Sequence, residues 1–332
     1  MIRPTLRFLS AAVLATISLA WIQAPFQASA QTQVPAAPAQ TPTAPAPAAA
    51  SVFPKPDPQF FTASAPTKET IDAFLLASWG YEDSRVWQVQ AILKTPIEGV
   101  SKVIIYVNDK NGKEKPSALQ FFVMPDGKHI ITGDQIVDFG EHPFAEYRSQ
   151  MQARADGPYR GGASKDLELV EFADFQCPHC KEAQANMDKL LVDFPKARII
   201  FQNDPIASIH PQSVIAASYG VCVAKLSGST AFFQYAAAVF DGQDGLATAD
   251  GATLTLNSAV TKAGLDPAKV AACAATPETK VAVDASVKLA NDISIGQVPT
   301  LVVNGRQVPA NAPYDTLKKI VAYQARIDGV TM

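Results

Sequence analysis

The sequence feature that most constrains the fold is a pair of cysteines, Cys177 and Cys180, placed where a strand pattern passes directly into a helix pattern. The run "DLELVEFADFQ" is typical of a buried strand, and "HCKEAQANMDKLLVDF" is typical of a helix. A second strand pattern, "ARIIFQN", follows this helix. Strand, crossover helix and strand in this order predict an α/β sheet.

The remainder of the chain completes the prediction of one domain over residues 166–332. A long helical section from about 210 to 292 indicates an insertion. "TLVVNG" and "RQVP" then predict a strand pair around Asn304 and Gly305, and "YDTLKKIVAYQARI" predicts a closing amphipathic helix. We therefore expect an α/β domain with a helical insertion.

The cysteine pair allows four chemical interpretations. A zinc site needs a second pair of ligands, but Cys222 and Cys273 are isolated in the sequence and His210 has no partner nearby. Attachment of c-type haem needs a histidine directly after Cys180, where Lys181 stands. A structural disulfide at the start of a helix would close a tight, strained ring, which is a poor cross-link for stabilising a fold. The interpretation with positive support is a redox centre that uses no metal and no other cofactor.

Residues 177–180 have the order that such a redox pair requires. The Cys177 sulfur would face the unpaired N–H groups and the positive end of the following helix, which favour thiolate over thiol. Pro178 suits the first helical turn because its missing N–H costs nothing there, and a protonated His179 would add positive charge. We expect Cys177 to be an exposed, attacking thiol and Cys180 to be a more buried, resolving thiol. A stabilised thiolate makes the disulfide form oxidising.

The first 30 residues are typical of a secretory signal peptide. Arg3 and Arg7 supply positive charge before the apolar run "FLSAAVLATISLAWI", and "ASA" at 28–30 offers a cleavage site before Gln31. The alternative is an uncleaved membrane anchor, although the run is shorter than the about 20 residues that a span needs. The sequence thus predicts a periplasmic or secreted protein, cleaved near Ala30 and Gln31. Disulfides persist in such compartments, so every cysteine counts as oxidisable.

Three segments precede residue 166. Residues 31–58 are rich in proline and alanine and predict a disordered linker, with a ligand tract as the alternative. Residues 59–149 carry the helix pattern "TKETIDAFLLASWG" and then alternating strand patterns, which predict a small α+β (cystatin-like) domain. Residues 150–165 indicate a polar connector whose Gly-Pro and Gly-Gly steps mark a flexible join. The net charge of −3 gives no support to nucleic-acid binding.

The segment "VEFADFQCPHC" resembles the active-site segment of the DsbA family of periplasmic disulfide oxidases, which have the thioredoxin fold. "IGQVPTLVVNGR" resembles the family's cis-proline loop, with Val298 before Pro299 as in the oxidases. The resemblance implies a protein thiol–disulfide oxidoreductase, a disulfide oxidase, that acts on unfolded or partly folded secreted clients and is recycled by a membrane redox partner. It also implies that Glu171 is a buried acid that assists proton movement, the alternative being a partly exposed strand glutamate.

Cys222 and Cys273 are left over once Cys177 pairs with Cys180. Both lie in helix patterns of the insertion, in "ASYGVCVAKL" and "PAKVAACAAT". We predict a structural disulfide between them, with no catalytic role. Two buried free thiols are the alternative, since cysteine is a common small apolar core residue.

The segment "FFVMPDGKHIITGDQIVDFG" resembles the final hairpin of the dimerisation domain in the disulfide isomerases DsbC and DsbG. This resemblance implies that residues 59–149 join two chains into a homodimer. It leaves two further functions open beside the oxidase. One is a homodimeric disulfide isomerase or reductase, and the other is a chaperone-like holder of unfolded clients.

Overall fold

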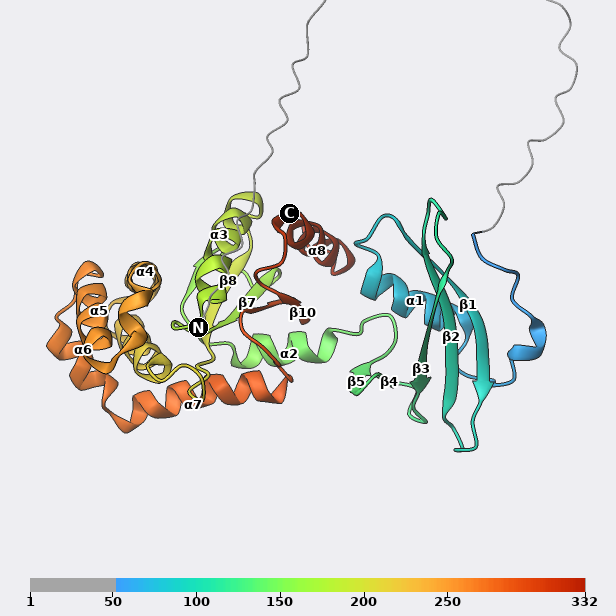
Figure 1. The fold of residues 1–332 in the computed structure, drawn as a ribbon, viewed down its shortest axis with the longest axis horizontal. Coiled ribbons are helices and arrows are strands. Elements are labelled where there is room, and N and C mark those ends of the chain that lie inside the picture. The colour runs from blue at the N-terminus through green and yellow to red at the C-terminus, as the bar shows by residue number, and fades with distance from the viewer. Residues whose placement is uncertain (1–51, 332) are drawn as a thin grey trace, which may run out of the picture. The chain divides into compact units, whose positions relative to one another are not determined.

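The computed structural model describes residues 52–331 of the chain. The predicted signal peptide and residues 31–51 of the predicted linker lie outside the described residues. Within residues 52–331 the strands form two five-stranded sheets (Figure 1). No helix in this range is both long enough and apolar enough to cross a membrane.

The first sheet is antiparallel throughout, in the order β1-β2-β3-β4-β5. Its strands are Arg85–Lys94 (β1), Ser101–Asp109 (β2), Ser117–Val123 (β3), His129–Thr132 (β4) and Gln135–Asp138 (β5). Helix α1, Lys68–Trp79, precedes them, and Thr67 caps it by accepting a hydrogen bond from the Thr70 N–H. Ile71 and Leu75 of α1 are buried in the core of this sheet. The predicted α+β arrangement is present.

The second sheet has the strand order β10-β9-β7-β8-β6. Its strands are Tyr159–Gly161 (β6), Glu168–Ala173 (β7), Arg198–Asn203 (β8), Thr300–Val303 (β9) and Arg306–Pro309 (β10). β7 and β8 run parallel and are joined by α3, Pro178–Asp193, whereas the other pairs are antiparallel. This is the α/β unit that the sequence predicted, with β7 at its centre.

Helices cover both faces of the second sheet (Figure 1). The remaining helices are Ala145–Arg154 (α2), Ser213–Asp241 (α4), Ala249–Lys262 (α5), Pro267–Ala274 (α6), Pro277–Asp292 (α7) and Tyr314–Ile327 (α8), with 3-10 turns at Pro58–Phe60 (η1) and Gln243–Ala247 (η2). Side chains alternate along β7. Leu169 packs with residues of α3 and α8, and Val170 and Phe172 pack with residues of α2 and α7. Because β7 is covered on both faces, all six of its residues are buried, including Glu168 and Glu171.

The predicted helical insertion is formed by α4, η2, α5, α6 and α7. Its apolar residues share one cluster with the cysteine pair. Phe232 and Tyr235 of α4 pack around Phe175, in the same cluster as Cys177 and Cys180. The insertion is therefore part of the wall that encloses the two sulfurs.

Part of the predicted connector at 150–165 has regular structure, contrary to the expectation of a flexible join. The end of α2 lies there, with Met151 buried against the sheet, and β6 pairs with β8. The Gly161–Gly162 step lets the backbone pass close to β8. A Cβ at Gly161 would lie 2.3 Å from the Ala197 carbonyl oxygen, and one at Gly162 would lie 2.1 Å from that of Lys196. The two glycines serve close backbone packing.

Candidate active site

Cys177 stands at the junction of a strand and a helix, as the sequence predicted. β7 ends at Ala173 and α3 begins at Pro178, so Cys177 is the N-cap of α3. Its carbonyl oxygen accepts hydrogen bonds from the N–H groups of Cys180 and Lys181, at 3.1 and 3.3 Å. The Cys177 side chain is thus held at the helix end whose N–H groups have no partners within the helix.

The two sulfurs belong to free thiols in opposite environments. The pKa of Cys177 is lowered from 9.0 to about 6, chiefly by a hydrogen bond from the Cys180 thiol. Burial opposes this, and the N–H groups of Cys180 and His179 and the charge of His210 support it. Burial raises the pKa of Cys180 far above its ordinary value, and the hydrogen bond with Cys177 raises it further. At neutral pH Cys177 is therefore a thiolate and Cys180 a thiol.

The Cys177 thiol is much less exposed than the sequence predicted. Cys177 keeps only 6% of its surface exposed, although Cys180 has none. The physical reason is that Cys177 lies in the apolar cluster that also holds Phe175, and Val298 packs against that cluster. The predicted order of burial between the two sulfurs is present, but a reacting thiol has only a narrow approach to Cys177.

The loop before β9 lies beside the attacking sulfur. The Val298–Pro299 peptide bond is cis, as the sequence predicted, and β9 begins directly after it at Thr300. The carbonyl oxygen of Val298 lies 4.0 Å from the Cys177 Sγ. A backbone hydrogen-bonding group therefore stands next to the sulfur that is placed to react.

Glu171 is buried in β7, on the side of the sheet that α3 covers. Its Oε1 accepts a hydrogen bond of 2.8 Å from the Gln184 side chain, which also donates to the Cys180 carbonyl oxygen at 3.2 Å. Burial raises the pKa of Glu171 to about 7, against the opposing effects of the Arg160 charge and the Gln184 hydrogen bond. A carboxyl group that titrates near neutrality can both accept and release a proton.

His179 points away from the apolar cluster. Its side chain is 62% exposed, and its Nδ1 lies 2.9 Å from an oxygen of Glu182. That hydrogen bond is the main cause that raises the pKa of His179. The backbone N–H of His179 is one of the N–H groups at the start of α3 that lower the pKa of Cys177, as the sequence predicted.

The predicted bridge between Cys222 and Cys273 is present, with an S–S distance of 2.01 Å. It joins α4 to α6. The hydroxyl of Thr279 lies 3.3 Å from the Cys222 sulfur and donates to the Cys273 carbonyl oxygen. The bridge therefore belongs to the packing of the insertion.

Three residues near the cysteine pair were not predicted from the sequence to belong to the site. Asp174 and His210 form a pair 2.8 Å apart, and Gln243 donates hydrogen bonds to the carbonyl oxygens of Phe175 and Cys177, at 2.8 and 2.9 Å. These contacts join positions more than 30 residues apart, so no local spacing reveals them. The one available signal was an acidic residue just before the cysteine pair.

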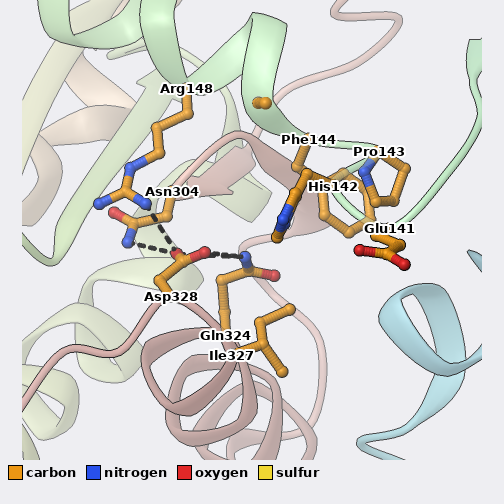
Figure 2. A pocket seen from close by; sticks show the side chains of 10 residues that line it. Glu141, His142, Pro143, Phe144, Arg148, Asn304, Gln324, Ile327 and Asp328 are labelled. Atoms are coloured by element: carbon orange, nitrogen blue, oxygen red, sulfur yellow. Dashed lines mark hydrogen bonds and ion pairs between the residues drawn. The ribbon is translucent and has the colours of Figure 1, made fainter. Parts of the chain in front are cut away.

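A separate pocket of about 250 Å³ includes no residue of the cysteine pair and no predicted site residue. Figure 2 shows Asp328 in it, hydrogen-bonded to Asn304 and Gln324 and paired with Arg148. Of the charged groups drawn there, Arg148 and Asp328 pair with each other. Within residues 52–331 no three histidine, cysteine or acidic side chains are grouped as metal ligands would be.

A family model described as thioredoxin matches residues 154–322, which are 169 of the 332 residues. The chain belongs to the thioredoxin family. Among solved structures, this thioredoxin-family chain is similar to a periplasmic thioredoxin-like protein from Salmonella enterica serovar Typhimurium. The sequence identity is 20% and the TM-score 0.44, over 55% of this chain and 97% of that one. It is also similar to the thiol-disulfide exchange protein alpha-DsbA2 from Wolbachia pipientis, with 21% identity and a TM-score of 0.46 over 53% and 95% of the two chains.

The chain also matches part of a curated protein with a different name. The chain is 28% identical over 156 residues to the Na(+)/H(+) antiporter NhaA 3 of Salinispora tropica. The match covers 47% of this chain and 22% of that protein, so the chain spans about a fifth of the length of this curated relative.

Proposed function

We propose that this thioredoxin-family protein is a thiol–disulfide oxidoreductase that acts as a disulfide oxidase on protein thiols. The observation that carries the proposal is the contrast between a stabilised thiolate at Cys177 and a buried thiol at Cys180. Because ionisation of Cys177 stabilises the reduced pair, the Cys177–Cys180 disulfide is a good acceptor of electrons from client thiols.

The reaction starts from the Cys177–Cys180 disulfide. A client thiolate attacks the Cys177 sulfur, which forms a mixed disulfide and releases Cys180 as a thiolate. The Cys180 thiolate takes up a proton, and Glu171, a buried carboxyl group whose pKa is raised to about 7 and whose charge acts on Cys180, is the proposed source. A second client thiolate then attacks the client sulfur of the mixed disulfide, and Cys177 leaves as a thiolate. Two electrons pass to the protein, and two client thiols become one disulfide.

The proposed partners follow from this chemistry. An unfolded or partly folded client would lay its backbone along Val298, beside the Cys177 sulfur, as in other cases where an extended peptide pairs with exposed backbone. A membrane redox partner would accept the two electrons and restore the disulfide. A periplasmic or secreted location is supported by the predicted signal peptide and by the Cys222–Cys273 bridge, because such bridges persist in oxidising compartments.

A homodimeric isomerase is the second candidate, and a feature of the first sheet favours it. β3 pairs with β2 along residues 117–123, but with β4 only at Phe122 and Val123. Residues 117–121 therefore have one open edge, to which another strand can add. The stabilised Cys177 thiolate and the valine at 298 favour the oxidase.

The test of the attack order uses the Cys180→Ala variant of the full chain. Without Cys180 the mixed disulfide with a client cannot be resolved, so adducts of the variant with reduced, unfolded secreted proteins are expected to accumulate on non-reducing gels. The control is Cys177→Ala/Cys180→Ala, which is expected to form none. If Cys180→Ala gives no more adducts than the control, the proposed exchange through Cys177 is wrong.

A further inference from the structure

Asp174 contacts the surroundings of both reactive sulfurs. It follows the last residue of β7, and its side chain is fully buried. Its backbone N–H donates to the Cys180 Sγ at 3.4 Å. Its carboxylate accepts hydrogen bonds from the N–H groups of Gln176 and Ile206, at 2.7 and 2.8 Å, and lies 2.8 Å from the Nδ1 of His210. The carboxylate is thus fixed on three sides.

His210 is held in place by its own backbone as well as by Asp174. Its N–H donates to the Ile206 carbonyl oxygen at 2.9 Å, and its carbonyl oxygen accepts from the N–H and the hydroxyl of Ser213, at 3.1 and 2.7 Å. The side chain is 16% exposed. Because the Nδ1 faces a carboxylate, that nitrogen carries the hydrogen, and protonation of the other ring nitrogen makes an imidazolium paired with Asp174.

The two histidines near the cysteine pair differ in environment. The His179 ring is exposed and pairs with Glu182, an exposed partner. The His210 ring is largely buried and pairs with a buried carboxylate, and its positive charge acts on Cys177. A charge that is shielded from water acts more strongly on a neighbouring sulfur than one in solvent.

We propose that Asp174 and His210 form a positioning pair for the exchange reaction, in which the buried carboxylate holds the imidazolium where its charge stabilises the departing Cys177 thiolate. This inference rests on the proposed function. His210 acts through its charge and does not touch the client. Asp174 acts on the Cys177 sulfur through His210, and on the Cys180 sulfur through its own backbone N–H.

Two further ionisable groups act on residues of this site. Asp204 lies just after β8, and burial, together with the charge of Asp174, raises its pKa to about 6. The charge of Glu171 acts on Cys180.

The test measures the thiolate absorbance of the full chain against pH, with the Cys177–Cys180 pair reduced and the Cys222–Cys273 bridge intact. Cys180 stays protonated in this range, so the signal belongs to Cys177. His210→Gln and His210→Asn remove the charge and are expected to move the Cys177 midpoint upward by less than about one pH unit, because the His210 charge ranks last among the causes that lower this pKa. His210→Lys returns a positive charge and is expected to restore most of the shift.

The matched control is His142→Gln, the same substitution at an exposed histidine outside the site, which is expected to leave the midpoint unchanged. Unchanged midpoints in both neutral His210 variants would overturn the proposal. A His210→Lys midpoint that stays with the neutral variants would also overturn it, because the effect would then not depend on charge. If adducts form in Cys180→Ala but the midpoints do not move, only the role of His210 is wrong, whereas absence of adducts contradicts the proposed function.

Discussion

Cys177 and Cys180 have the same side chain, and their surroundings make them chemically different. The position of Cys177 at the start of α3 is local, so the sequence predicted its stabilised thiolate correctly. The charge of His210 was not predictable, because this residue reaches the site from a loop after β8, 33 positions further along the chain. The narrow exposure of Cys177 likewise depends on the packing of the insertion.

Glu171 gives the first prediction at the scale of a residue. Its pKa is raised from 4.5 to about 7 by burial, so the folded state holds a proton that the unfolded state releases between these values. The contribution of Glu171 to the free energy of unfolding therefore falls as the pH rises from about 4.5 to about 7. Glu171→Gln removes this loss and is expected to be more stable than the native chain above pH 7, by on the order of 3 kcal/mol.

Urea unfolding of the two proteins at pH 4.5 and pH 8, with the cysteine pair in the same redox state, measures this difference. The control is Glu98→Gln, which changes an exposed glutamate in the turn before β2 and is expected to show no such pH-dependent gain. A stability difference between Glu171→Gln and the native chain that is equal at both pH values would contradict the raised pKa of Glu171.

At the scale of elements, periodic patterns predicted most of the fold. Elements that carry an apolar pattern or a clear cap could be predicted from the sequence. These are α1, α3, α8, β1, β2, β7 and β8. α2 and β6 were missed. α2 is polar with Met151 as its buried residue, and β6 is a three-residue strand that exists only through its pairing with β8. The turn at Gly133 that separates β4 from β5 was also missed, because the two strands are four residues each.

The Cys222–Cys273 bridge gives a prediction at the scale of elements. It closes a loop with a sequence separation of 51 between α4 and α6. Replacing both cysteines by alanine is expected to lower the free energy of unfolding by about 4 kcal/mol, through the entropy gained by the unfolded chain. Urea unfolding measures the loss, and adduct formation in a Cys180→Ala background is expected to persist. Loss of adducts from a variant that is still folded would show that the bridge takes part in the exchange.

At the scale of the whole molecule, the open edge of β3 bears on how the chains associate. Exposed strand edges pair readily with other chains unless they are protected. Leu119 lies on this part of β3 and is 45% exposed, which adds apolar surface to the edge. The resemblance to isomerase dimerisation domains, the edge and Leu119 together favour a homodimer formed through residues 59–149.

Sedimentation of the full chain tests this association. We expect a dimer at micromolar concentration and a monomer for Leu119→Lys, because a charge at the edge opposes strand pairing. Leu254→Lys is the matched control, since Leu254 is an exposed leucine on α5. A native chain that is monomeric, or a Leu119→Lys chain that is as dimeric as the control, would contradict the predicted interface.

The reduction potential of the Cys177–Cys180 pair tests the central claim most directly. The stabilised Cys177 thiolate predicts an oxidising pair, with a potential nearer to about −120 mV than to about −270 mV, the values typical of a strong disulfide oxidase and of thioredoxin. Equilibration of the full chain against glutathione buffers of known ratio gives the value. A potential near that of thioredoxin would contradict the account, because electrons would then flow from the pair to client disulfides.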